Sequence, residues 1–200
     1  MQFYEFGAFQ SISANLEIWG TNSALVPRSV QLLLQFFDLD SSWTDTMMHK
    51  FLLLPNQSTE LLSVPCPAPE VPPDAPYECG SLDRFTKVTR THSIIVSVQL
   101  LDAETGEVLA RNVDWPQPYR YLTFPDPGLN LKVDGETVQI ESQRPVKGVV
   151  LSVDGTPEVK WSDNALDVIP GDPQTVLAEG LGGRTIKTRY MGQSATIKPI

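Results

Sequence analysis

The sequence predicts an all-β protein made of two consecutive sandwiches, and three observations support this prediction. Seventeen prolines and thirteen glycines occur among the 200 residues, which is more than helices accommodate, because proline interrupts a helix and glycine destabilises it. Apolar and polar residues alternate in several short segments, as in strands that bury one face. These segments contain no helical apolar stripe flanked by capping residues. A chain of this composition is expected to consist of short strands and turns.

The first half of the chain contains the clearest alternation. Over 30–36, apolar residues at the even positions face Gln31 and Gln35 at the odd ones, which predicts a half-buried strand. Residues 94–100 repeat this pattern, and Asp102–Gly106 is expected to form a hairpin loop that leads into a strand near 108–113. Shorter apolar runs predict three further strands, at 16–20, 51–54 and 60–64.

Two proline-rich stretches organise the chain. Six prolines lie between Pro65 and Pro76, and such a stretch cannot pair inside a sheet, so 65–79 is expected to be a long loop within the first domain. Four more prolines lie in 115–128, between two strand-rich regions. We therefore predict a boundary near Leu122, with domains at 1–121 and 122–200.

The second domain shows turn signals every eight to twelve residues. Examples are Asp134-Gly135, Asp154-Gly155 and Pro170-Gly171, which separate short β-rich segments. About seven strands in roughly 75 residues indicate a small immunoglobulin-like sandwich. The predicted fold class is thus all-β, with two consecutive immunoglobulin-like β-sandwich domains. The expected strands lie near 132–133, 137–138, 149–153, 159–161, 166–169, 176–178 and 186–190.

Charge and targeting signals restrict the partners. The chain has 15 basic and 24 acidic residues, a net charge of −9, so nucleic acid and anionic membranes would repel it. No run reaches the roughly 18 apolar residues of a membrane-spanning helix. The N-terminus lacks the basic flank and small-residue cleavage site of a signal peptide. We therefore expect a cytoplasmic protein, although a parent enzyme could be secreted.

The sequence offers no recognisable metal or cofactor site. Cys66 and Cys79 bracket the proline-rich loop, where a disulfide and two free thiols both remain open. Together with His49 and His92 they do not give the spacing of a zinc site. The glycine-rich segment 179–185 lacks the G-K-[ST] ending of a phosphate loop and no convincing helix follows it, so a turn is expected there.

Aromatic side chains are the candidates for ligand contact. Flat indole and phenol rings suit the faces of sugar rings, while packing within or between domains is the alternative. Carboxylates are plentiful, but no spacing brings two of them to one site, so we predict no catalytic residue and no hydrolysis by this chain alone. The candidates for sugar or interdomain contact are Trp19, Trp43, Trp115 and Tyr119.

Several segments resemble the C-terminal immunoglobulin-like domains of glycoside hydrolase family 2 β-mannosidases. The matching stretches are FPDPGL (124–129), KGVVLSVDG (147–155) and SDNALDVIPGDPQTV (162–176), with looser matches at NLEIWGTNS (15–23) and 102–122. The resemblance covers about residues 12 to 192 and implies a modular enzyme that releases terminal β-mannose from oligosaccharides. In that family a (β/α)8 barrel before these domains carries two glutamates of a retaining mechanism.

This chain differs from the family because it contains neither the catalytic barrel nor the acid/base motif. A (β/α)8 barrel needs about 250 residues, and no asparagine here is followed by the glutamate that the family's acid/base motif requires. Two functions remain open: a non-catalytic accessory region with a β-mannosidase barrel as partner, or an autonomous module that binds an oligosaccharide or a protein. Joint exposure of Trp19 and Trp43 would favour the autonomous module.

Overall fold

The computed structural model describes residues 2–5, 14–67, 69, 93–116 and 118–193. These residues form strands apart from loops and one short 3-10 helix, η1 (Tyr119–Tyr121). Two compact units divide the chain, Met1–Leu122 and Thr123–Ile200, one residue after the boundary drawn from the sequence. No helix in the described ranges has the length and apolar character needed to cross a membrane.

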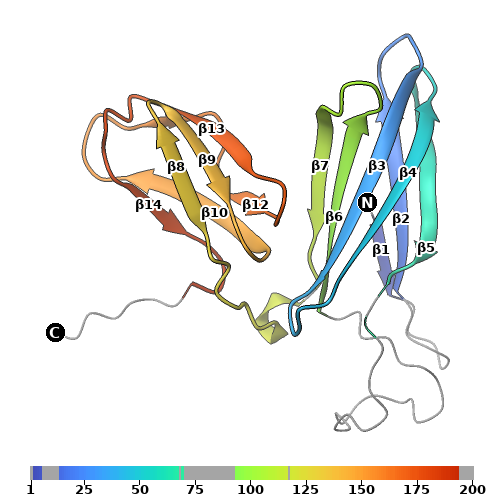
Figure 1. The fold of residues 1–200 in the computed structure, drawn as a ribbon, viewed down its shortest axis with the longest axis horizontal. Helices are drawn as coiled ribbons and strands as arrows, with labels where there is room; N and C mark the ends of the chain where they lie inside the picture. The colour runs from blue at the N-terminus through green and yellow to red at the C-terminus, as the bar shows by residue number, and fades with distance from the viewer. Residues whose placement is uncertain (1, 6–13, 68, 70–92, 117, 194–200) are drawn as a thin grey trace, which may run out of the picture. The chain divides into compact units, whose positions relative to one another are not determined.

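The first unit is a sandwich of a three-stranded and a four-stranded antiparallel sheet. The strand orders are β1-β2-β5 and β4-β3-β6-β7 (Figure 1). The chain crosses from one sheet to the other after β2, β4 and β5, as in immunoglobulin-like topologies. The strands are β1 (Gln2–Glu5), β2 (Ala14–Asn22), β3 (Arg28–Asp38), β4 (Thr44–Leu53), β5 (Gln57–Pro65), β6 (Ile94–Asp102) and β7 (Val108–Asp114).

Alternation in β3 builds much of the first core. Val30, Leu32, Leu34 and Phe36 are all buried, as the sequence predicted, while Gln35 and the other intervening residues are partly exposed. The expectation for β6 was wrong in one respect. Ser97 and Gln99 were placed on a solvent-facing side, but β6 lies between β3 and β7 and is buried on both faces.

Two strands of the first unit were wholly or largely missed by the sequence prediction. Only 51–54 was expected where β4 runs from Thr44 to Leu53, and β1 was not expected at all. Strand β4 lies at a sheet edge, so its inward residues stay partly exposed and include the polar Asp45 and His49. Edge strands tolerate such residues, which weakens the alternation that reveals a strand.

The second unit has seven strands, the number that the turn spacing predicted. They form sheets of order β12-β10-β14 and β11-β13-β9-β8. Buried residues of both sheets, from Val138 to Leu181, make a core separate from that of the first unit. The strands are β8 (Asn130–Asp134), β9 (Thr137–Glu141), β10 (Val146–Val153), β11 (Lys160–Trp161), β12 (Leu166–Val168), β13 (Gln174–Glu179) and β14 (Ile186–Arg189).

Candidate binding surfaces

The four candidate aromatic residues occupy different environments. Trp19 is 53% exposed on β2, whereas Trp115 is 3% exposed. Trp43, just before β4, is half-buried against the first core, and Tyr119 is half-buried in η1. Trp19 and Trp43 are therefore not exposed together, and only Trp19 offers most of its ring to a ligand.

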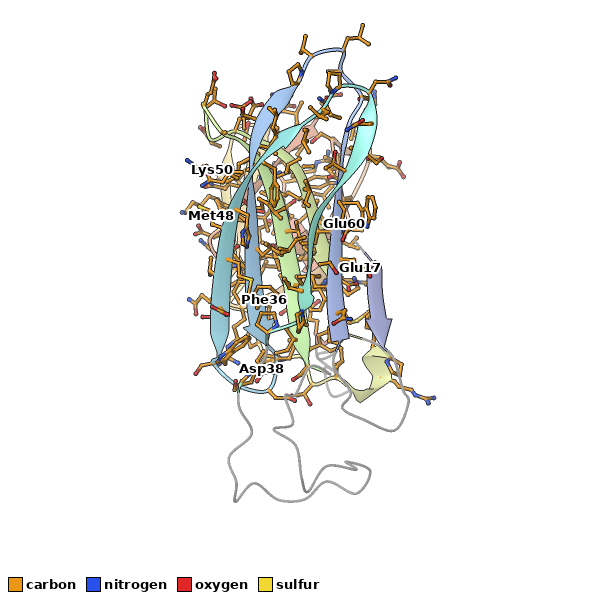
Figure 2. All side chains as sticks on the ribbon, turned by 90° about the vertical axis from the view of Figure 1, so that its right-hand side faces the viewer. Glu17, Phe36, Asp38, Met48, Lys50 and Glu60 are labelled. Atoms are coloured by element: carbon orange, nitrogen blue, oxygen red, sulfur yellow. The ribbon has the colours of Figure 1, made fainter. Side chains whose placement is uncertain are left out.

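Trp19 lies on the outer face of the β1-β2-β5 sheet among polar residues. It pairs with Glu60 on β5, and Glu17 pairs with Ser63 one step along the same face. Figure 2 shows Glu17 and Glu60 on these neighbouring strands. An indole flanked by carboxylates is a combination that can stack on and hydrogen-bond to a sugar.

A β-bulge sets the position of Trp19. The register shifts between Ile18 and Trp19, so that Leu61 is an extra residue in β5 and turns into the core. Gly20 makes room for it: a Cβ at this position would lie 2.9 Å from Leu61 Cδ1. The sequence signal for this bulge is the isolated glycine inside a strand pattern, which commonly marks such irregularities.

Carboxylates of the first unit organise loops. Asp38 accepts hydrogen bonds from the hydroxyls of Ser93 and Ser41, both at 2.6 Å, at the turn after β3. Asp102 accepts bonds from the backbone N–H groups of Thr105 and Glu104 in the β6–β7 hairpin. These bonds, together with a bond from the Arg28 guanidinium, hold the pKa of Asp102 below its ordinary value. Both carboxylates thus stabilise loops through hydrogen bonds.

The Cys66 thiol is buried at the end of β5. Burial, and secondarily the charge of Asp114, raises its pKa from the ordinary value of 9.0 to about 12. Its Sγ lies 3.6 Å from the carbonyl oxygen of Pro67. A thiol that stays protonated at neutral pH is a poor nucleophile and metal ligand. Cys79, the other cysteine of the chain, lies outside the described residues, so a disulfide and two free thiols both remain open.

No group of three or more histidine, cysteine, aspartate or glutamate side chains in the described part of the chain is arranged to hold a metal ion.

The glycine-rich segment of the second unit is a turn, as expected. Leu181 and Arg184 donate backbone bonds to Ala178 and Leu181 carbonyls. The Arg184 guanidinium donates to the carbonyls of Gly180 and Pro157 at 2.6 and 2.7 Å. Glu136 accepts a bond from the Gly180 N–H at 2.7 Å. One backbone donor of the segment, the Gly180 N–H, is thus already bound by a carboxylate.

The SDN segment (162–164) makes both local and long-range hydrogen bonds. Asp163 bonds locally, accepting a bond from the Asn164 N–H at 2.7 Å. The Asn164 amide, however, bonds to both the N–H and the C=O of Leu151 on β10, at 2.7 and 3.0 Å. Ser162 accepts a bond from the Leu177 N–H on β13. The segment therefore links the two sheets of the sandwich, because β10 and β13 belong to different sheets.

Asp167 also acts in the fold. It projects from β12 between buried Leu166 and Val168. Its carboxylate accepts a bond from the Gly148 N–H at 2.8 Å and pairs with Lys147 at 3.2 Å. These contacts span the irregular register between β10 and β12.

Two family models account for most of the chain. A mannosidase Ig/CBM-like domain matches residues 14–121, and an Ig-fold domain matches residues 124–188. Their shared boundary coincides with the division between the two compact units.

Characterised relatives give the same assignment. The chain is 30% identical over 188 residues to β-mannosidase B of Thermothelomyces thermophilus and 31% identical over 194 residues to that of Aspergillus niger. Each match covers 90% of this chain but 20% of the relative. The chain thus spans about one fifth of the length of these curated relatives.

A solved structure supports the fold. The β-D-mannosidase of Dictyoglomus thermophilum superposes on 88% of this chain and 20% of its own, with a TM-score of 0.62 at 16% identity. At this identity the likeness concerns the fold alone. The chain therefore belongs to the mannosidase Ig/CBM-like family, with an Ig-fold domain after it, and corresponds to the C-terminal Ig region of β-mannosidases.

Proposed function

We propose that this chain serves as the accessory region of a glycoside hydrolase family 2 β-mannosidase and supports a catalytic barrel that acts in mannan degradation. The barrel would release terminal β-D-mannose, and this region would stabilise it without contributing a catalytic residue. One observation carries the proposal: both modules match β-mannosidase B over 90% of this chain, yet within only 20% of the relative.

The polar contacts of the described residues support an architectural role. Asp38 and Asp102 hold loops of the first unit, while Asp167 and Asn164 join strands of the second. A retaining glycosidase instead holds two carboxyl groups about 5–5.5 Å apart across an open site. Acids already satisfied by backbone donors are poorly suited to that chemistry.

Grafting tests the proposal directly. The matched fifth of Thermothelomyces thermophilus β-mannosidase B would be replaced by this chain, and hydrolysis of an aryl β-mannoside would be measured. The graft should hydrolyse the substrate, while the isolated chain should not. A graft that expresses but has lost both activity and a cooperative melting transition would overturn the proposal, as would hydrolysis by the isolated chain that disappears on mutation of one of its own carboxylates.

The exposure of Trp19 opposite Glu60 favours a second function, an autonomous oligosaccharide-binding module. In that case mannobiose should quench or shift tryptophan fluorescence with saturation, and Trp19→Ala should abolish the response. Met48→Ala provides the control, because Met48 has the same exposed fraction, 53%, on β4 of the other sheet. The absence of a saturable response would exclude this function for mannobiose.

A further inference from the structure

We propose that one end of the first unit is the docking surface for the catalytic part of a β-mannosidase, and this inference rests on the function proposed above. We call this surface the aliphatic end. It lies where the β2–β3 connection and the β4–β5 connection come together, at the same end of the unit in Figure 1. It is made by the side chains of Leu25, Val26, Leu52 and Leu54.

These four side chains are unusually open to solvent. Leu25 is 86% exposed, Val26 65%, Leu52 55% and Leu54 47%. They are four of the ten large apolar residues that are exposed among the described residues, and the other six are spread along both units. Adjacent exposed aliphatic residues mark interaction surfaces far more often than isolated ones do.

The aliphatic end also lacks charge. No acidic or basic residue occurs in 22–27 or in 51–59, in a chain of net charge −9. Charges lie at its margin, where Arg28 pairs with Asp102 at 3.2 Å and the β6–β7 hairpin carries Glu104 and Glu107. An apolar centre with charges confined to the rim is the usual composition of a protein–protein interface. Sugar sites, in contrast, require polar groups that hydrogen-bond to hydroxyls.

Hydrogen bonds fix the two loops in one arrangement. The buried Asn22 side chain donates to the carbonyls of Val26 at 2.9 Å and Leu53 at 3.2 Å, and accepts from the Ala24 N–H. The Asn56 N–H donates to the Ala24 carbonyl at 3.0 Å. Because the loops are already ordered, little conformational entropy would be lost when a partner covers them.

The direction of β1 indicates the occupant. Strand β1 pairs antiparallel with β2, Gln2 opposite Glu17 and Glu5 opposite Ala14, while β2 runs on to Asn22 at the aliphatic end. Polypeptide preceding Gln2 in a longer enzyme would therefore continue toward the aliphatic end. In the curated relatives about four fifths of the protein lies outside the matched region, and this region is C-terminal. The polypeptide that leads from the catalytic part would thus join the first unit beside this surface.

The test uses the grafted enzyme described above. Leu25→Gln and Leu54→Gln would be combined, and cleavage by a protease between the catalytic part and the graft would be timed. The matched control combines Leu177→Gln with Val150→Gln, two exposed aliphatic residues of the second unit. We expect the first pair to speed cleavage at least about tenfold, because truncated interface anchors commonly weaken association by that factor or more. The control pair should leave the rate unchanged.

The possible results separate the two proposals. An active graft whose cleavage rate is the same with both pairs would overturn the docking surface and leave the proposed function standing. A graft that is neither active nor folded would overturn the proposed function, and the docking surface with it. In the isolated chain the first pair should change the melting temperature by less than about 2 °C, because both side chains are exposed.

Self-association is the remaining alternative. Sedimentation of the isolated chain should show a monomer. A dimer that the Leu25→Gln and Leu54→Gln pair dissociates would assign the aliphatic end to a second copy of the chain instead of the catalytic part.

Discussion

The two sandwiches differ in how they satisfy their backbone hydrogen-bonding groups. In the first unit, β2 to β6 have 9 to 11 residues each, and the backbone ladder between them is nearly continuous. In the second unit the strands have 2 to 8 residues. Side chains there bond to distant backbone groups, as Asn164 does to Leu151 and Glu136 to Gly180.

This difference follows from the cost of unpaired backbone groups. A buried N–H or C=O needs a hydrogen-bond partner, and long strands provide one at nearly every residue. Short strands end early and leave groups that only side chains can satisfy. The first unit should therefore be most sensitive to loss of apolar volume, and the second should also be sensitive to loss of particular polar side chains.

Phe36→Ala should produce the largest effect. Phe36 is fully buried in the first core, so its truncation should lower the free energy of unfolding of that unit by about 3–5 kcal/mol. Calorimetry would measure the loss, and hydrogen exchange of peptides from each unit would locate it. Equal loss of protection in the second unit would show that the two units unfold together, contrary to their separate cores.

Leu166→Ala should have a somewhat smaller effect, confined to the second unit. Leu166 is 6% exposed in the second core, and the cavity left by its truncation should cost about 2–4 kcal/mol. Urea unfolding of the full chain would measure the loss, and hydrogen exchange of peptides from each unit would locate it in the second unit. A change below about 1 kcal/mol would mean that β12 contributes little to the core.

Asn164→Ala should cost about 2 kcal/mol, because it leaves the N–H and C=O of Leu151 without their partner. Asp163→Ala is the matched control and should cost about 1 kcal/mol, since Asp163 makes one local bond to backbone. Both are measured by urea unfolding. Equal effects of the two substitutions would contradict the role of Asn164 in linking segments distant in sequence.

Alkaline pH should produce the smallest effect, a loss of stability in the first unit alone. The pKa of Cys66 is about 12 when folded and 9.0 ordinarily, so between these values the unfolded chain loses a proton that the folded chain keeps. Stability of the first unit should therefore fall as pH rises above 9, by about 1 kcal/mol between pH 9 and 10. Comparison with Cys66→Ala isolates this contribution, and an unchanged pH dependence in that variant would exclude it.

The fold was largely predictable because its main signals are local. Alternation in β3 and the turn dipeptides of the second unit depend on residues close in sequence, and the structure confirms both. Strand β4 was only partly predicted, since an edge strand may carry polar residues on its inward face. The burial of Ser97 and Gln99 was missed, because it depends on the strands that flank β6.

The candidate surfaces were less predictable than the fold. Trp19, Trp43, Trp115 and Tyr119 were all candidates for sugar or interdomain contact in the sequence, and only the structure separates exposed Trp19 from buried Trp115. The sequence did not mark Leu25, Val26, Leu52 and Leu54 as one surface, and 51–54 was expected only as a strand, because short apolar runs are ordinary in a β-rich sequence.

The sequence by itself determined the all-β class, the two domains and the resemblance to β-mannosidase accessory domains, since periodicity, turn residues and motifs are properties of neighbouring residues. The tertiary structure decided which aromatic ring faces solvent, which polar side chains join the sheets and which loops together form the aliphatic end. The physical reason is that these features arise from contacts between segments far apart in sequence. Asn22 and Leu53, 31 residues apart, hold the two loops of that end together, and no local pattern in either segment encodes that contact.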